Sequence, residues 1–136
     1  RAIVSEIRKG TDIATTTQLQ QIIKDALQFI PENTRSEEIK KSCQRCFQAL
    51  RIDVNSEFEV LYDFLEKLPS SLAESGRVAI LSFHSGEDRL VKKSFKRFYR
   101  EGLYREISPH AIRPSAEECN SNGRARSAKL RWAIKA

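Results

Sequence analysis

Apolar side chains recur every three or four residues between Leu19 and Ile30, a spacing that predicts a helix with one buried face. Thr17 and Gln20 have the spacing of a capping box, so we expect the helix to begin there. Pro31 lacks the backbone N–H that a helix interior needs, and it predicts the end of the helix.

A longer apolar stripe follows in the second part of the helical region. Thr34 and Glu37 repeat the capping-box spacing at its start, and no Gly or Pro interrupts the stripe before Pro69. We expect one long helix or two helices in tandem. A continuous apolar stripe of this kind requires a partner surface.

The pattern changes after Gly76, where residues 77–83 form a short and almost wholly apolar run. Such a run predicts a strand buried on both faces, as in a parallel sheet that helices cover. Ser85 and Asp88 have the spacing of a helix start after the next turn. The predicted helix has one apolar face, and its other face is a basic row made up of Arg89, Lys92, Lys93, Lys96, Arg97 and Arg100.

Residues 101–123 predict a loop, because they contain two prolines, a glycine at each end and several Asn and Ser residues. Apolar and basic residues alternate over 128–135, which predicts a half-buried or edge strand. A helical layer followed by strand, helix and strand indicates the α/β class. We divide the chain into a helical segment, residues 1–70, and a strand-containing segment, residues 71–136.

Charge is distributed unevenly along the 136 residues, whose net charge is +6. Residues 1–75 carry ten Lys/Arg and twelve Asp/Glu, whereas residues 76–136 carry fourteen and six, so that the two parts differ by ten charges. A basic part beside a nearly neutral part is typical of a surface that faces a polyanion. The alternative is charge that serves solubility alone.

Several classes of protein fit poorly. No apolar run approaches the ~20 residues of a membrane span, and the first residues do not have the pattern of a signal peptide. Because the chain does not begin with Met, we expect an excerpt of a longer protein.

The chain has three cysteines, and this odd number indicates reduced thiols. Cys43 and Cys46 lie in a helical pattern without a second ligand pair, so we expect core packing and no metal site. No G-x-S-x-G elbow supports a serine hydrolase.

Three segments resemble the ribosomal RNA small subunit methyltransferase H family, also called the MraW family. Residues 45–58 resemble the family's FQALRI-x-VN-x-E-L stretch, residues 82–92 its SFHSLEDR-x-VK, and residues 122–131 its NPRARSAKLR. They occur in the family's order, and the resemblance covers nearly the whole chain. Gly86 replaces the usual Leu and Gly123 the usual Pro.

The resemblance implies the C-terminal part of a Rossmann-like class I methyltransferase sheet, together with a helical substrate-recognition segment. It implies transfer of the methyl group of S-adenosylmethionine to the exocyclic amine of a cytidine near the decoding centre of the small-subunit ribosomal RNA. In such proteins the cofactor-binding residues lie in the N-terminal half. The five glycines here are too far apart for a Gly-rich loop, so we assign no cofactor residue to this chain.

The end of the predicted strand is the place where α/β sheets bind ligands. Ser82, His84, Ser85 and Asp88 could there supply hydrogen bonds to an unstacked cytosine and accept the departing proton. We take them as candidate catalytic residues, with His84 and Asp88 near the acceptor base. The alternative is that Asp88 caps the helix and pairs with Arg89 or Arg51, while His84 only shapes the turn.

Candidate RNA-binding residues lie in three places. Arg51 and Asn55 share one helical face beside the apolar stripe, where polar packing between helices is the alternative role. Arg89 follows Asp88. The last group has no acid among its members and predicts phosphate contacts, with a charged strand edge as the alternative; it consists of Arg124, Arg126, Lys129 and Arg131.

The resemblance implies small-subunit ribosomal RNA, or the assembling subunit, as partner and no membrane. A second copy of the chain is a further expected partner. The compartment is then the bacterial cytoplasm or the interior of an organelle. Two other hypotheses remain, a non-catalytic RNA-binding or ribosome-assembly module that lacks the cofactor half, and a helical interaction domain.

Overall fold

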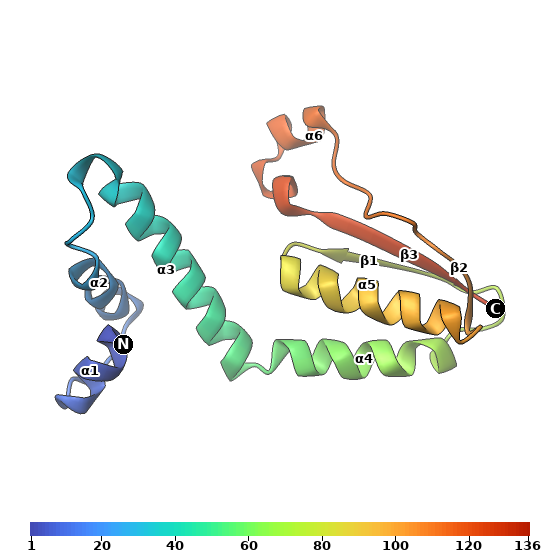
Figure 1. Ribbon diagram of the computed structural model, residues 1–136, viewed down its shortest axis with the longest axis horizontal. Coiled ribbons are helices and arrows are strands. Elements are labelled where there is room, and N and C mark those ends of the chain that lie inside the picture. Colours follow the sequence, from blue (N-terminus) through green and yellow to red (C-terminus); the bar gives the residue numbers. More distant parts are fainter. The chain divides into compact units, whose positions relative to one another are not determined.

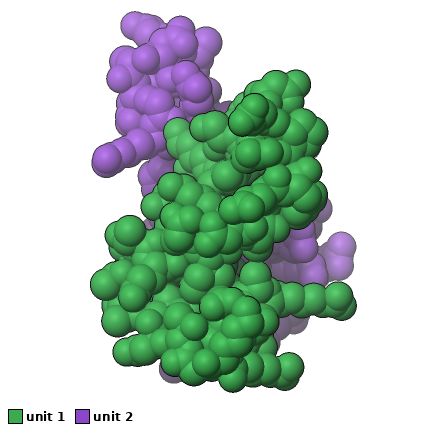
Figure 2. Space-filling model, turned by 90° about the vertical axis from the view of Figure 1, so that its left-hand side faces the viewer, with its two compact units in different colours: residues 1–55 green, residues 56–136 purple.

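A computed structural model describes residues 1–136 and divides them into two compact units. The first unit consists of residues 1–55 and the second of residues 56–136 (Figures 1 and 2). None of the helices has the length and apolar content that a bilayer span requires.

The first unit is built from three helices, α1 (Ala2–Arg8), α2 (Thr16–Ala26) and α3 (Glu32–Val54). Its small core consists of Leu19 and Ile23 from α2 and Cys43 from α3. Cys46 packs against the same cluster, and its thiol and that of Cys43 are free. The expectation that these two cysteines serve as core residues is therefore confirmed.

The helix starts differ from those expected. The capping box of α2 is formed by Thr15 and Gln18, two residues before the pair that we expected. Pro31 precedes the first residue of α3, where its missing N–H costs nothing, so that Thr34 lies inside the first turn of α3. The prediction for α2 was wrong because Thr and Gln recur at a spacing of three, and spacing alone cannot choose among the pairs. The prediction for α3 was wrong because that helix begins after Pro31 without a side-chain cap.

The second helical stretch is two helices in tandem, α3 and α4 (Glu57–Ser71). Asn55 closes α3, where its N–H donates to the Arg51 carbonyl over 3.1 Å. Ser56 then takes the left-handed conformation, with φ at 49°, and breaks the helical path. Pro69 does not end α4, which continues for two more residues.

The second unit contains α4, a three-stranded sheet and the helix α5 (Ser85–Arg100). The strands are β1 (Arg77–Ser82), β2 (Tyr104–Ile107) and β3 (Lys129–Lys135), in the order β1-β3-β2. A short helix, α6 (Ala116–Ser121), and a 3₁₀ turn, η1 (Gly123–Ser127), precede β3 (Figure 1). The expected α/β class is confirmed.

The sheet is antiparallel, and this corrects the expectation of a parallel sheet around residues 77–83. Arg77 lies opposite Ile134 and Ser82 opposite Lys129. β1 is an edge strand of which only alternate residues are covered, and the Leu81 side chain is 54% exposed. An apolar run shows how hydrophobic a strand is but not the direction of its neighbour. Here the second apolar face of β1 is exposed within its own unit, residues 56–136.

β3 is the central strand, so of the two expectations for residues 128–135, a half-buried or an edge strand, the edge strand is wrong. Ala133 is completely buried between its two neighbours. β2 and α6 lie within the segment expected to be a loop. β2 was missed because it is four residues long, contains the polar pair Arg105 and Glu106, and pairs with β3 through a bulge.

The core of the second unit lies between α5 and one face of the sheet. Phe95 and Phe98 of α5 meet the Tyr104 ring edge to face, with centroids 5.5 Å and 6.1 Å apart. Leu65 and Leu68 of α4 complete this cluster. The start of α5 is thereby held against the end of β1, where ligand-binding residues were expected.

Candidate functional site

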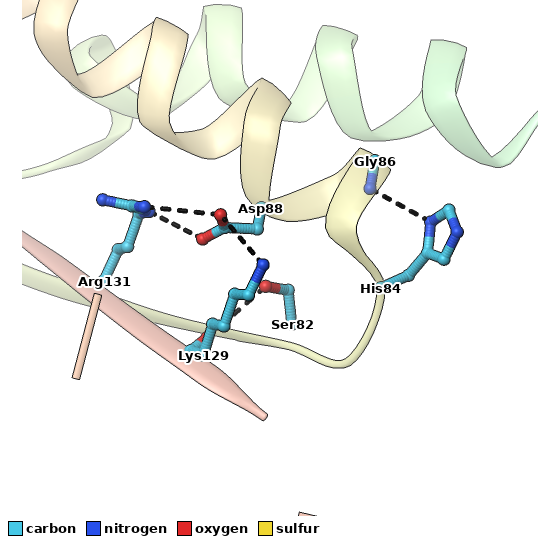
Figure 3. A network of polar contacts seen from close by, with 6 residues as sticks. All are labelled: Ser82, His84, Gly86, Asp88, Lys129 and Arg131. Carbon is cyan, nitrogen blue, oxygen red and sulfur yellow. Dashed lines mark hydrogen bonds and ion pairs between the residues drawn. The ribbon is translucent and has the colours of Figure 1, made fainter. Parts of the chain in front are cut away.

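The turn from β1 to α5 is closed by the imidazole of His84. His84 is the N-cap of α5, and its Nδ1 accepts a hydrogen bond from the Gly86 N–H over 3.2 Å (Figure 3). A neutral imidazole that accepts at Nδ1 carries its proton on Nε2. The half-buried ring therefore offers an Nε2–H donor to a ligand.

The His84 ring stacks on Phe58 of α4, with centroids 6.1 Å apart and planes 22° from parallel. Gly86 makes this arrangement possible. A Cβ at Gly86 would lie 2.7 Å from Phe58 Cζ and 3.0 Å from the His84 ring. A side chain at this place would require the Phe58 ring to shift.

Asp88 is a buried carboxylate held by β3. Its Oδ1 accepts from Arg131 Nε over 2.7 Å and its Oδ2 from Arg131 Nη2 over 3.3 Å. Lys129 Nζ lies 3.5 Å from Oδ2. The hydrogen bonds from Arg131, followed by the charges of Arg131 and Lys129, lower the pKa of Asp88 despite burial. A carboxylate in this state is a weak proton acceptor and a strong structural counter-ion.

Ser82 belongs to the same cluster, and Ser85 does not. The buried Ser82 hydroxyl donates to the Lys129 carbonyl over 3.4 Å, whereas Ser85 is exposed at the first position of α5. Figure 3 shows the carboxylate of Asp88 turned toward β3 and the ring of His84 on the other side of the helix start. The structure thus separates the four candidate catalytic residues into an ionic cluster and a turn.

The candidate RNA-binding cations also fall into two groups. Arg131 is 8% exposed and bound to Asp88, and Lys129 is largely covered, so both point into the protein. Arg124 and Arg126, in η1, are exposed, as is Arg89 on α5. Position in the sequence did not distinguish these groups, because alternation in a strand reveals two faces without saying which one a helix covers.

Arg51 and Asn55 lie in the first unit, at the end of α3. Both are exposed. Both remain candidates for RNA contact because they share one helical face. The structure adds that the Asn55 backbone N–H caps the C-terminus of α3.

Two features of the site were missed by the sequence analysis. The first is Phe58, which was counted as one more member of the apolar stripe. The second is a groove of about 390 Å³ on the outer face of the sheet, lined in part by Leu81, Phe83, Ile112 and Leu130. The exposed Phe83 beside the predicted turn was a signal for the groove, but the β1–β3 register was needed to recognise it.

Comparison with known proteins gives a consistent result. The sequence model described as the MraW methylase family matches residues 1–136. The chain is 84% identical over its full length to ribosomal RNA small subunit methyltransferase H 2 of Alkaliphilus metalliredigens, and it covers 39% of that protein. It is 68% identical over its full length to methyltransferase H 1 of Lachnoclostridium phytofermentans, of which it covers 37%. The chain spans about two fifths of the length of these curated relatives.

Proposed function

The chain belongs to the MraW methylase family, and from this premise we propose that it forms the C-terminal part of a small-subunit ribosomal RNA methyltransferase. The reaction would transfer the methyl group of S-adenosylmethionine to the exocyclic N4 amine of a cytidine. The names of the relatives support the RNA and the class of reaction. The bacterial cytoplasm, or an organelle that assembles ribosomes, is the compartment that follows from this activity.

The residues present do not form a complete cofactor site. A cofactor with an ammonium, a ribose diol and a sulfonium needs several converging polar groups. The groove beside β1 is mainly apolar, and its one carboxylate side chain is Glu118. We therefore place the cofactor in the part of the relatives that this chain does not cover, and the roles below concern the acceptor RNA alone.

The capped turn carries the proposal. His84 Nδ1 is occupied by the Gly86 N–H, so Nε2–H is the group that His84 presents to a base. Cytosine has two acceptors on the same edge as N4: the ring N3, which is next to the amine, and the O2 carbonyl oxygen beyond it. A donor at one of them would orient N4 toward the methyl group, and N4 would lose one proton to water as its new bond to carbon forms. His84 would thus position the cytosine, with the exposed Ser85 hydroxyl as a second contact.

The ionic cluster has a supporting role in this proposal. Asp88 connects the first turn of α5 to Arg131 and Lys129 of β3. Ser82 ties the end of β1 to the same strand. Together these contacts fix the turn from which His84 projects, so we assign Asp88 and Ser82 to positioning the turn.

Arg124, Arg126 and Arg89 would contact RNA phosphates, because they are exposed and cationic in the same unit as the turn. Arg51 and Asn55 are proposed as further RNA contacts from the first unit. Arg131 and Lys129 are proposed to act through Asp88, by holding the turn that carries His84, and not to contact phosphates directly.

A chimera tests the role of His84. The matching segment of the Alkaliphilus metalliredigens relative is replaced by this chain, and methylation of small-subunit ribosomal RNA is measured with His84→Asn. Asn is a good N-cap, so α5 keeps its start while the imidazole donor is lost. We expect methylation to fall about 100-fold, which is the lower range for removal of a positioned catalytic group.

His110→Asn is the matched control, since His110 is the other histidine and lies exposed in a connecting segment. This variant should methylate at the parent rate. An unchanged rate in the His84→Asn chimera, with an intact fold, would remove His84 from the site. An inactive parent chimera with an intact fold would contradict the methyltransferase assignment itself.

A second candidate function is a non-catalytic RNA-binding module, which the basic residues 76–136 favour. Calorimetric titration of the 136-residue chain with S-adenosylmethionine should give no binding at millimolar cofactor, whereas the parent chimera should bind. Binding by the chain alone would show that our placement of the cofactor is wrong. A chimera that binds RNA but transfers no methyl group would favour the module.

A further inference from the structure

The exposed side of α5 bears a row of cations, of which the proposed function so far uses Arg89 alone. Five of its side chains are exposed and positively charged, and we call them the α5 basic face: Arg89, Lys92, Lys93, Lys96 and Arg100. At 100° per residue they fall within an arc of about 100° on the helix surface. The opposite side of α5 is the buried one, with Val91, Phe95 and Phe98.

The charges of the α5 basic face are not neutralised by carboxylates of the same unit. Arg97, the sixth cation of the predicted basic row, is bound by Glu66 of α4 and lies 3.6 Å from Glu101. None of the five has an ion pair with a carboxylate in residues 1–136. Like charges at spacings of three and four residues repel one another and destabilise a helix. A row of this kind is therefore best explained by a polyanion that binds it.

The position of the row indicates which polyanion. Arg89 lies one turn from the His84 cap, and Arg100 ends α5. The row is about 16 Å long at 1.5 Å per residue, long enough to contact several successive phosphates of one RNA strand. On the basis of the proposed function, we propose that the α5 basic face binds the RNA backbone that leads to the His84 turn.

An anionic membrane fits this surface less well. A basic helix that binds a lipid surface inserts its apolar face among the acyl chains. The apolar face of α5 is already buried against Tyr104 and Ala133 of the sheet and Leu65 of α4. What remains available is a cationic ridge without apolar neighbours, which suits phosphates in water.

The test is the salt dependence of RNA binding by the full 136-residue chain. Binding of a transcript of bacterial small-subunit ribosomal RNA is measured between 50 and 300 mM KCl for the parent and for Lys92→Gln/Lys93→Gln/Lys96→Gln. Each lost phosphate contact lowers the slope of log K against log salt by about 0.7 to 0.9. We expect the triple variant to lose about 2 from the slope. Gln has a helix propensity close to that of Lys, so α5 should persist.

The matched control removes three cations of the same unit from other surfaces. Lys67→Gln/Arg77→Gln/Arg105→Gln lowers the net charge equally and leaves α5 and residues 124–131 unchanged; all three side chains are exposed. This variant should keep most of the parent slope. A second variant, Arg89→Gln/Arg100→Gln, removes the two ends of the face and should lose about 1.5 from the slope.

The outcomes separate this inference from the proposed function. If the parent chain shows no salt-dependent binding to the transcript, the RNA-facing role itself fails. If the parent binds and the α5 variants lose no more slope than the control, the inference is overturned. It is also overturned if the α5 variants keep RNA binding but lose binding to vesicles of anionic phospholipid, which would assign the face to a membrane.

Discussion

At the scale of single residues, Gly86 controls how closely Phe58 and His84 approach the start of α5. The family pattern has a leucine in place of Gly86 and a leucine in place of Phe58, so both departures occur at one contact. The space beside the His84 ring therefore depends on this pair of residues and not on either one alone.

Gly86→Ala tests this dependence. The added Cβ would meet Phe58 Cζ at 2.7 Å, and we expect a loss of about 1–3 kcal/mol in the free energy of unfolding. Phe58→Leu shortens the ring side chain and should recover most of this loss in the double variant. The measurement is urea unfolding followed by the fluorescence of Trp132, the one tryptophan of the chain.

Gly123→Ala is the control, because a Cβ there meets nothing within 4 Å. Equal losses at the two glycines would mean that backbone freedom, and not the contact with Phe58, explains the effect. Additive effects of Gly86→Ala and Phe58→Leu would show that the two positions do not interact.

Asp88 gives the second prediction at this scale. Asp88→Asn leaves Arg131 and Lys129 without their counter-charge, and we expect a loss on the order of 3 kcal/mol at pH 7. Because the pKa of Asp88 is lowered by Arg131 in the folded chain, the stabilisation is complete above the usual carboxyl value of 3.8 and is lost as the pH falls through the folded pKa. The stability gap between parent and variant should therefore shrink below pH 4. A gap that stays constant down to pH 2 would contradict the ion pair.

At the scale of elements, periodicity predicted the helices better than their limits. The apolar spacing identified α2, α3, α4 and α5, because one buried face needs a repeat of 3.6 residues. The limits depended on which of several similar Thr and Ser residues caps a helix, and spacing could not decide this. The partner of Asp88 was equally hidden, since Arg131 lies 43 residues away and only the β1–β3 register brings them together.

The cap of α2 can be tested against the cap that spacing suggested. Thr15→Ala removes the acceptor for the Gln18 N–H and should destabilise the first unit by about 1 kcal/mol. Thr17→Ala, inside the helix and exposed, should be neutral or slightly stabilising, because Ala is the better helix former. Thermal unfolding followed by circular dichroism at 222 nm measures both. A larger loss of stability for Thr17→Ala than for Thr15→Ala would support the cap that we predicted from the spacing of Thr17 and Gln20.

At the scale of the whole molecule, the three motifs identified the family from the sequence. They carry no information on where the chain divides into two compact units. The motifs are long enough to identify the chain over most of its length. The break between the compact units rests on one left-handed residue, Ser56, which no periodicity reveals. Each unit has its own core, with Leu19, Ile23 and Cys43 in the first and the Phe95–Tyr104 cluster in the second.

Separate cores predict separate responses. Thr15→Ala should lower the denaturant concentration at which the first unit unfolds, as detected by circular dichroism. The midpoint detected by Trp132 fluorescence should not change, since Trp132 belongs to β3 in the second unit. Asp88→Asn should shift the fluorescence midpoint. If both probes moved together in both variants, the units would unfold as one cooperative body.

The margin of the sheet has a practical consequence. β1 leaves one row of backbone N–H and C=O groups without a neighbouring strand, and the exposed Leu81 side chain lies along the same ribbon. An unpaired strand edge is a template to which further copies of the chain can pair. Concentrated solutions of the 136-residue chain should therefore aggregate with time, which a rise in turbidity measures. Ala79→Lys, which places a charge at an exposed position of β1, should reduce this aggregation.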